Sequence, residues 1–111
     1  MAKDDFFVIA YKILAYLYEC MKAGEDADIR LISYESFGIP KRYWMSIITN
    51  LYEKGYIIGV REIHLPGVAR SLHEVDRPEI TMDGIEYLQN NSSMEKAKRF
   101  LKDLKDMIPG I

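Results

Sequence analysis

Hydrophobic side chains near the start of the chain recur at steps of three and four residues, which is the spacing of one face of an α-helix. This face consists of Phe6, Ile9, Ala10, Ile13, Leu17 and Cys20. An aspartate at position 4 or 5 can cap the first turn, and Gly24 suits the C-terminal cap. The pattern predicts a helix from Phe6 to Met21.

The same helix has a second hydrophobic stripe, made of Phe7, Tyr11, Leu14 and Tyr18. A further helix is predicted over about 92–108, where an S-x-x-E capping box precedes apolar positions that include Leu101, Leu104 and Ile108. These two surfaces either pack on each other within one chain, form a symmetric homodimer, or bind another protein. The sequence leaves the three arrangements open.

The pattern in the middle of the chain predicts two short secondary-structure elements followed by a longer helix. Residues 29–32 alternate as a short edge strand would, and Ser33 can cap a short helix that Gly38 ends. Pro40 suits the first position of a helix from Pro40 to Lys54. Its buried face would consist of Tyr43, Trp44, Ile47, Ile48 and Leu51.

A β-hairpin is predicted after this helix, from β-branched and aromatic residues that run from Tyr56 to His64. Leu65-Pro66-Gly67 is a turn signal, and the chain through Arg77-Pro78 is typical of a loop. A short returning strand would cover 79–81. Thr81 is then expected to cap a helix over 82–90.

The order of these elements is that of a winged helix, an α+β fold in which a helix-turn-helix is followed by a hairpin. We expect one domain over residues 1–111, with the winged-helix core at about 4–91 and an additional C-terminal helix at about 92–108. The wing would be about 65–77, and the helix from Pro40 to Lys54 would be the recognition helix.

Four segments carry a resemblance to a known family: Tyr43-Trp44, residues 51–60 (LYEKGYIIGV), residues 80–88 (ITMDGIEYL), and the last helix, which ends in Ile108-Pro109-Gly110. Together they resemble the YjcQ-type proteins, small winged-helix proteins of Gram-positive bacteria and their phages. The resemblance covers nearly the whole chain and implies the winged-helix fold. It implies no biochemical activity and no role for any single residue.

Composition narrows the range of possible functions. The 111 residues include 15 Lys and Arg, 17 Asp and Glu and one cysteine, with a net charge of −2. One cysteine excludes a disulfide framework and a cysteine-based zinc site. The chain has no run of roughly 20 apolar residues that would span a membrane, and its acidic N-terminus does not resemble a secretory signal. We expect a cytoplasmic, non-enzymatic protein with no cofactor, metal or small-molecule substrate, because no phosphate-binding loop, metal-ligand spacing or nucleophile motif is present.

Double-stranded DNA is the first partner to consider. Residues 31–60 hold three Lys and Arg against two Glu, so the predicted recognition helix lies in the one mildly basic stretch. Lys41 and Arg42 could contact phosphates or guanine edges, whereas Ser46, Thr49 and Asn50 could read base edges. The wing offers Arg61, Arg70 and Arg77, with His64 and His73, to phosphates. About four such contacts would give a log affinity–log salt slope near −3.6.

An ordinary amphipathic helix also has a polar outer face, so the same residues fit a winged helix that binds another protein and no DNA. Surface charge separates these two interpretations. A continuous positive surface around the predicted recognition helix would favour DNA, whereas a mixed or acidic one would favour a protein partner.

Overall fold

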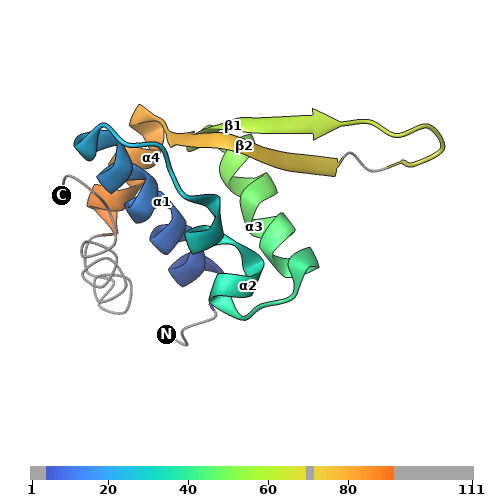
Figure 1. Ribbon diagram of the computed structural model, residues 1–111, viewed down its shortest axis with the longest axis horizontal. Helices are drawn as coiled ribbons and strands as arrows, with labels where there is room; N and C mark the ends of the chain where they lie inside the picture. The colour runs from blue at the N-terminus through green and yellow to red at the C-terminus, as the bar shows by residue number, and fades with distance from the viewer. Residues whose placement is uncertain (1–4, 70–71, 92–111) are drawn as a thin grey trace.

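A computed structural model describes residues 5–69 and 72–91 of the chain. In this part the protein is mixed α+β, with four α-helices, one 3-10 helix and a two-stranded antiparallel sheet. In chain order the elements are α1 (Phe6–Ala23), η1 (Ile29–Ile32), α2 (Tyr34–Phe37), α3 (Lys41–Glu53), β1 (Ile57–Ile63), β2 (Leu72–Ile80) and α4 (Met82–Asn90). The helices pack together, and the β1–β2 hairpin reaches out past α3 (Figure 1). The helix expected at about 92–108 lies outside the described residues.

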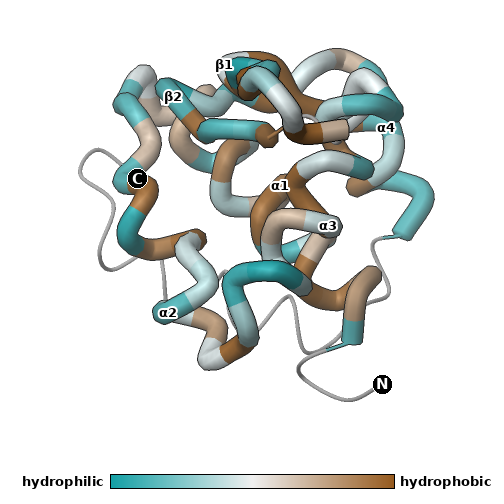
Figure 2. The backbone as a smooth tube through the Cα atoms, turned by 90° about the vertical axis from the view of Figure 1, so that its right-hand side faces the viewer, coloured by the Kyte–Doolittle hydropathy of each residue, from teal (hydrophilic) through white to brown (hydrophobic). Residues whose placement is uncertain are grey.

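Helix α1 confirms the first prediction and extends it by two residues. The carboxylate of Asp5 accepts a hydrogen bond from the backbone N–H of Phe7 at 3.0 Å, and Gly24 closes the helix in the left-handed conformation. Ile9, Ile13 and Leu14 are fully buried, because α1 packs against α3, α4 and β2. Figure 2 shows its hydrophobic stretches in the middle of the molecule.

The expectation of an edge strand at residues 29–32 is wrong, because these residues form the 3-10 helix η1. The side chain of Asp28 accepts a hydrogen bond from the N–H of Arg30, and the N–H of Leu31 donates to the Asp28 carbonyl. Ile32 is buried, and its carbonyl accepts a hydrogen bond from the indole N–H of Trp44 at 2.8 Å. An aspartate cap thus starts a helical turn where alternation alone indicated a strand.

Helices α2 and α3 follow the predicted pattern. The hydroxyl of Ser33 caps α2 by accepting from the N–H of Ser36, and Gly38 ends this helix. Pro40 is the N-terminal cap of α3, so the helix begins at Lys41, one residue after the predicted start. On α3 the buried residues are Trp44, Ile47, Ile48 and Leu51, and Tyr43 is half-buried. The opposite side of α3 is left open for contacts.

The hairpin differs from the prediction in its second strand. Strand β2 begins at Leu72, not at Glu79, and pairs with β1 from Ile63↔Leu72 to Ile57↔Ile80. The second part of the wing expected over 65–77, from Leu72 onward, is therefore strand. The turn at Leu65–Gly67 is confirmed, since the N–H of Val68 donates to the Leu65 carbonyl.

A β-bulge explains why Pro78 does not end the strand. Pairing passes from Ile58↔Glu79 to Val60↔Val75, so β2 has two extra residues opposite β1. Arg77 adopts a positive φ of 54° in this bulge, and Gly59 faces it with φ 81°. A Cβ on Gly59 would lie 2.2 Å from the Arg77 carbonyl oxygen, so this approach requires glycine.

Helix α4 confirms the predicted bounds and completes the core. The hydroxyl of Thr81 accepts a hydrogen bond from the N–H of Gly84 as an N-terminal cap. Gly84 lets α4 approach the start of the hairpin, since a Cβ there would lie 2.4 Å from the Tyr56 carbonyl oxygen. Within residues 5–69 and 72–91, none of the helices has the length and apolar character needed to cross a bilayer.

Candidate nucleic-acid interface

The open side of α3 and the neighbouring hairpin enclose a groove with a volume of about 780 Å³. We call it the α3–hairpin groove, and it is lined by Lys41, Arg42, Met45, Ser46, Thr49, Asn50, Glu53, Glu62, Leu72 and His73. All five residues that the sequence assigned to DNA contact on this helix therefore lie in one place. On the hairpin side, Glu62 lies in the predicted strand, whereas Leu72 and His73 lie in β2 where the sequence suggested a loop.

Lys41 and Arg42 occupy the exposed first turn of α3. The ammonium of Lys41 lies 5.9 Å from the centre of the Tyr34 ring. In the described part of the chain, no carboxylate forms an ion pair with Lys41 or Arg42. The N-terminus of a helix also carries a partial positive charge. This end of the groove is therefore suited to an anion.

Ser46 and Asn50 are exposed but partly engaged with their own helix. The Ser46 hydroxyl donates to the Arg42 carbonyl at 3.3 Å, and the Asn50 amide donates to the Ser46 carbonyl at 2.8 Å. Such bonds, four residues back along a helix, leave the carbonyl oxygen and the second N–H of Asn50 available. Both side chains keep the capacity to contact a base edge.

Thr49 has a structural contact that the sequence did not predict. Its hydroxyl lies 3.2 Å from Nδ1 of His73, and the His73 ring lies 5.7 Å from the ring of Tyr52. His73 lies on β2 and is 8% exposed, because its side chain packs between the hairpin and α3, so it is not presented to solvent as a phosphate contact. The two residues join the hairpin to α3.

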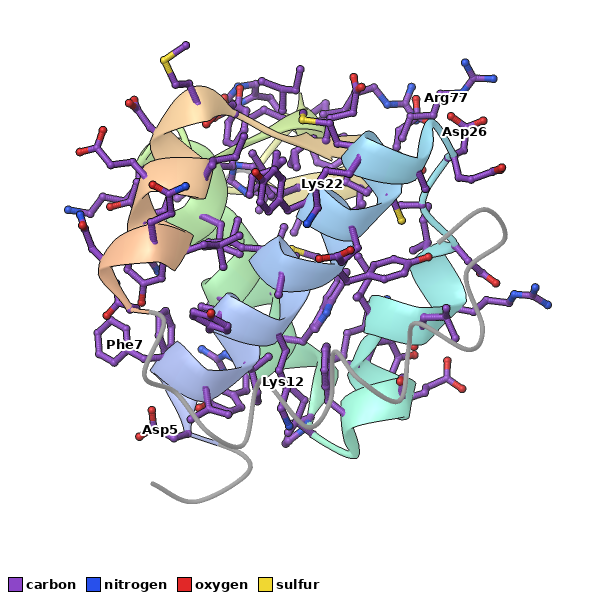
Figure 3. The ribbon with its side chains drawn as sticks, turned by 90° about the vertical axis from the view of Figure 1, so that its left-hand side faces the viewer. Asp5, Phe7, Lys12, Lys22, Asp26 and Arg77 are labelled. Carbon is purple, nitrogen blue, oxygen red and sulfur yellow. The ribbon has the colours of Figure 1, made fainter. Side chains whose placement is uncertain are left out.

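Of the three arginines predicted on the wing, the two that the structure describes lie in different places. Arg61 forms an ion pair with Glu74 across the hairpin, with 2.8 Å between Nη2 and Oε2. Arg70 lies outside the described residues. Arg77 lies in the bulge, near Asp26 and the C-terminal end of α1, and Figure 3 shows both at the same corner. The wing therefore supplies fewer free cations to the groove than the sequence suggested.

Charge in the α3–hairpin groove is divided. Lys41 and Arg42 lie at the N-terminal end of α3, whereas Glu53 ends the helix and Glu62 lies on the hairpin. Glu62 also lies 3.6 Å from the ring of His64. The surface is positive at the N-terminal end of α3 and carries carboxylates at its C-terminal end and on the hairpin, so it is mixed and not continuously positive.

Part of the second stripe of α1 lies in the core of the chain, whereas the sequence left its partner open. Tyr11 and Leu14 are 7% and 0% exposed, because they belong to the core that α1 forms with its neighbours. Tyr18 is half-buried beneath the ammonium of Lys22, which lies 4.4 Å from the ring centre. Only Phe7, at 56% exposed, remains open in this stripe. The positions paired with it, Leu101, Leu104 and Ile108, lie outside the described residues.

Two buried side chains of α1, Tyr16 and Cys20, have raised pKa values. Burial raises the pKa of the Cys20 thiol, which keeps it protonated at neutral pH and therefore weakly nucleophilic. Burial raises the pKa of Tyr16 to about 12, and its hydroxyl accepts a hydrogen bond from the N–H of Asp28. In the described ranges no group of three or more His, Cys, Asp or Glu is placed to hold a metal ion.

These features define a small α+β protein with an exposed helix beside a projecting hairpin. The profile of the family described as YjcQ protein matches residues 11–107, and the chain belongs to this family. It is 31% identical over 108 residues to "Uncharacterized protein YjcQ" of Bacillus subtilis (strain 168), an alignment that covers 97% of this chain and 99% of the relative. The comparison with solved structures gave no significant match.

Proposed function

We propose that this protein is a non-enzymatic winged-helix protein that binds double-stranded DNA and acts as a regulator. Helices α2 and α3 would form the helix-turn-helix, and the first turns of α3 would enter the major groove. The element order from α1 to α4, with a projecting hairpin after α3, supports this fold.

The observation that carries the proposal is the pair of adjacent, exposed and unneutralised cations at the start of α3. Two other exposed arginines are engaged: Arg30 forms an ion pair with Asp28, and Arg61 with Glu74. Lys41 and Arg42 have no such partner in the described part of the chain. Free cations displace counterions from phosphates, whereas paired ones must first give up their carboxylate.

The acidic end of the groove does not cancel these cations. Helix α3 has 13 residues, so Lys41 and Glu53 are separated by roughly 18 Å along the axis at a rise of 1.5 Å per residue. The Debye length is about 8 Å at physiological ionic strength. A duplex held at the first turns of α3 would therefore experience mainly the positive end.

The test is a salt titration of binding to a labelled random-sequence duplex. Two phosphate contacts give an expected log–log slope of about −1.8, shallower than the −3.6 expected from the sequence. Arg42→Ala should weaken binding and flatten the slope by roughly one. Arg30→Ala is the matched control, because it removes an exposed arginine whose charge is already paired. Undetectable binding at about 50 mM salt, or an equal effect of both variants, would refute the proposal.

A protein partner in the same groove is the second candidate, and the divided charge favours it. The double variant Glu53→Gln/Glu62→Gln separates the two. If DNA occupies the groove, removing these carboxylates should strengthen duplex binding mainly at low salt, where the Debye length is longer and phosphate repulsion reaches farther. If the groove serves a protein, neither the parent nor the variant should bind the duplex.

A further inference from the structure

A second hollow lies on another side of the molecule, between the C-terminal end of α1, the connection to η1 and the bulge of β2. We call it the bulge pocket. Its volume is about 490 Å³, within the range of about 300–1,000 Å³ that is usual for ligand sites. Arg77 and Asp26 mark its position in Figure 3, at the opposite end of α1 from Phe7.

Part of the wall of the bulge pocket is apolar. Leu17 and Met21 contribute from α1, Ile29 from η1 and Pro78 from the bulge. Met21 is 47% exposed and Ile29 is 37% exposed, so apolar surface lies open to water here. Covering this surface would be favourable, because apolar area removed from water stabilises a complex by roughly 25 cal/mol per Å².

Four carboxylates surround this apolar wall: Glu25 and Asp26 before η1, and Asp76 and Glu79 on β2. None of the four forms an ion pair in the described part of the chain. Arg77 is the single cation in the lining, so the pocket keeps an excess of negative charge. The C-terminal end of α1 adds the negative end of a helix dipole.

We infer that the bulge pocket docks a lysine or arginine side chain from a basic segment of a partner protein. The alkyl stem of such a side chain would lie along Met21 and Ile29, while its charged head would reach the carboxylates at the rim. The apolar stem matches the apolar part of the wall, and the cationic head matches the carboxylates at the rim. The inference does not depend on DNA binding, because the pocket shares no lining residue with the α3–hairpin groove.

An apolar wall distinguishes this occupant from a free inorganic cation. In the described residues, no cluster of His, Cys, Asp and Glu is arranged to bind a metal ion. A lysine-bearing segment would bury Met21 and Ile29, which a hydrated cation would leave exposed. The protein would then have one surface for DNA and another for a protein partner.

The test uses the full chain and a labelled decapeptide that contains lysine and leucine. The matched control peptide carries acetylated lysines, which keep the alkyl stem and lose the charge. We expect the lysine peptide to shift the NMR amide signals of Ala27 and Ile29, and the acetylated peptide to leave them unchanged. Asp26→Asn/Asp76→Asn should weaken binding roughly five- to tenfold, because it removes one carboxylate from each side of the rim.

Three results would overturn the inference. The first is an equal loss of affinity in Glu35→Gln/Glu86→Gln, which removes two exposed carboxylates outside the pocket and keeps the net charge matched. The second is an equal response to spermidine, which would assign the pocket to free polyamines. The third is the absence of shifts at Ala27 and Ile29. Unchanged amide spectra elsewhere in both double variants would show that the fold is intact.

Discussion

The hydroxyl of Thr49 and the Nδ1 atom of His73 lie 3.2 Å apart, although 24 residues separate them in the chain. Beyond the pair formed by Val60 and Val75, His73 is the one buried residue of the described hairpin. This contact therefore fixes the position of the outer hairpin against α3. It also fixes the width of the α3–hairpin groove.

Thr49→Val tests this contact while keeping the shape of the side chain. Loss of the hydrogen bond at a largely buried site should lower the free energy of unfolding by about 1 kcal/mol in urea denaturation. Ser46→Ala is the control, since its hydroxyl bonds only to its own helix at the surface, and it should change stability by less than about 0.5 kcal/mol. Equal stability of Thr49→Val and the parent would contradict the structural role.

Gly59→Ala tests the close approach at the bulge. The new Cβ would overlap the Arg77 carbonyl at 2.2 Å, and the positive φ is strained for alanine, so we expect a loss of about 2–4 kcal/mol in stability. Gly67→Ala is matched to it, because φ is 76° there and a Cβ at this position would have no atom within 4 Å. That variant should lose only about 1 kcal/mol. Similar losses in both would show that the overlap is relieved by movement of the strand.

The raised pKa of Tyr16 determines part of the fall in the free energy of unfolding at alkaline pH. Its pKa is raised to about 12 from 10 in the unfolded chain, so its hydroxyl is neutral in both states below pH 10. Between pH 10 and 12 the unfolded chain ionises first, and the folded state loses stability as pH rises. Tyr16→Phe removes this ionisation, so its stability should fall less steeply over that interval. Tyr11 and Tyr87 also have raised pKa values, so part of the slope should remain.

The burial of the α1 stripe bears on self-association. Because Tyr11 and Leu14 are in the core, Phe7 is the one widely exposed residue of that stripe, which is little area for a stable dimer. We therefore expect Phe7→Asp to have the same mass as the parent in sedimentation experiments. A dimeric parent that this substitution converts to monomers would show that α1 carries the interface.

The helices could be predicted because their signals are local. Asp5, Ser33 and Thr81 each cap the helix that follows within three residues, and the periodicity of α3 identified its four buried positions. Residues 29–32 were misassigned because a pattern of four residues is too short to separate a strand from one helical turn. The predicted second strand was too short because Pro78 indicated a loop. The bulge that admits this proline depends on Gly59 in the other strand.

The candidate site could be predicted only in part, for a related reason. Sequence identifies Lys41, Arg42, Ser46 and Asn50 as one face of a helix, and the structure keeps them on one face. It could not show that Arg61 is neutralised by Glu74 or that Thr49 is engaged by His73. Both partners, Glu74 and His73, lie on β2 and are positioned by the pairing of the two strands. The local spacing of residues does not encode this pairing.

The two extra residues of β2 also have a consequence for relatives of this protein. The bulge supplies Asp76, Arg77 and Pro78 to one wall of the bulge pocket, while the core contacts of the hairpin are made on either side of it. A shorter second strand, with regular pairing, would keep the fold and lose that wall. The length of this strand should therefore sort the family into members with and without the pocket, even where overall identity is the same.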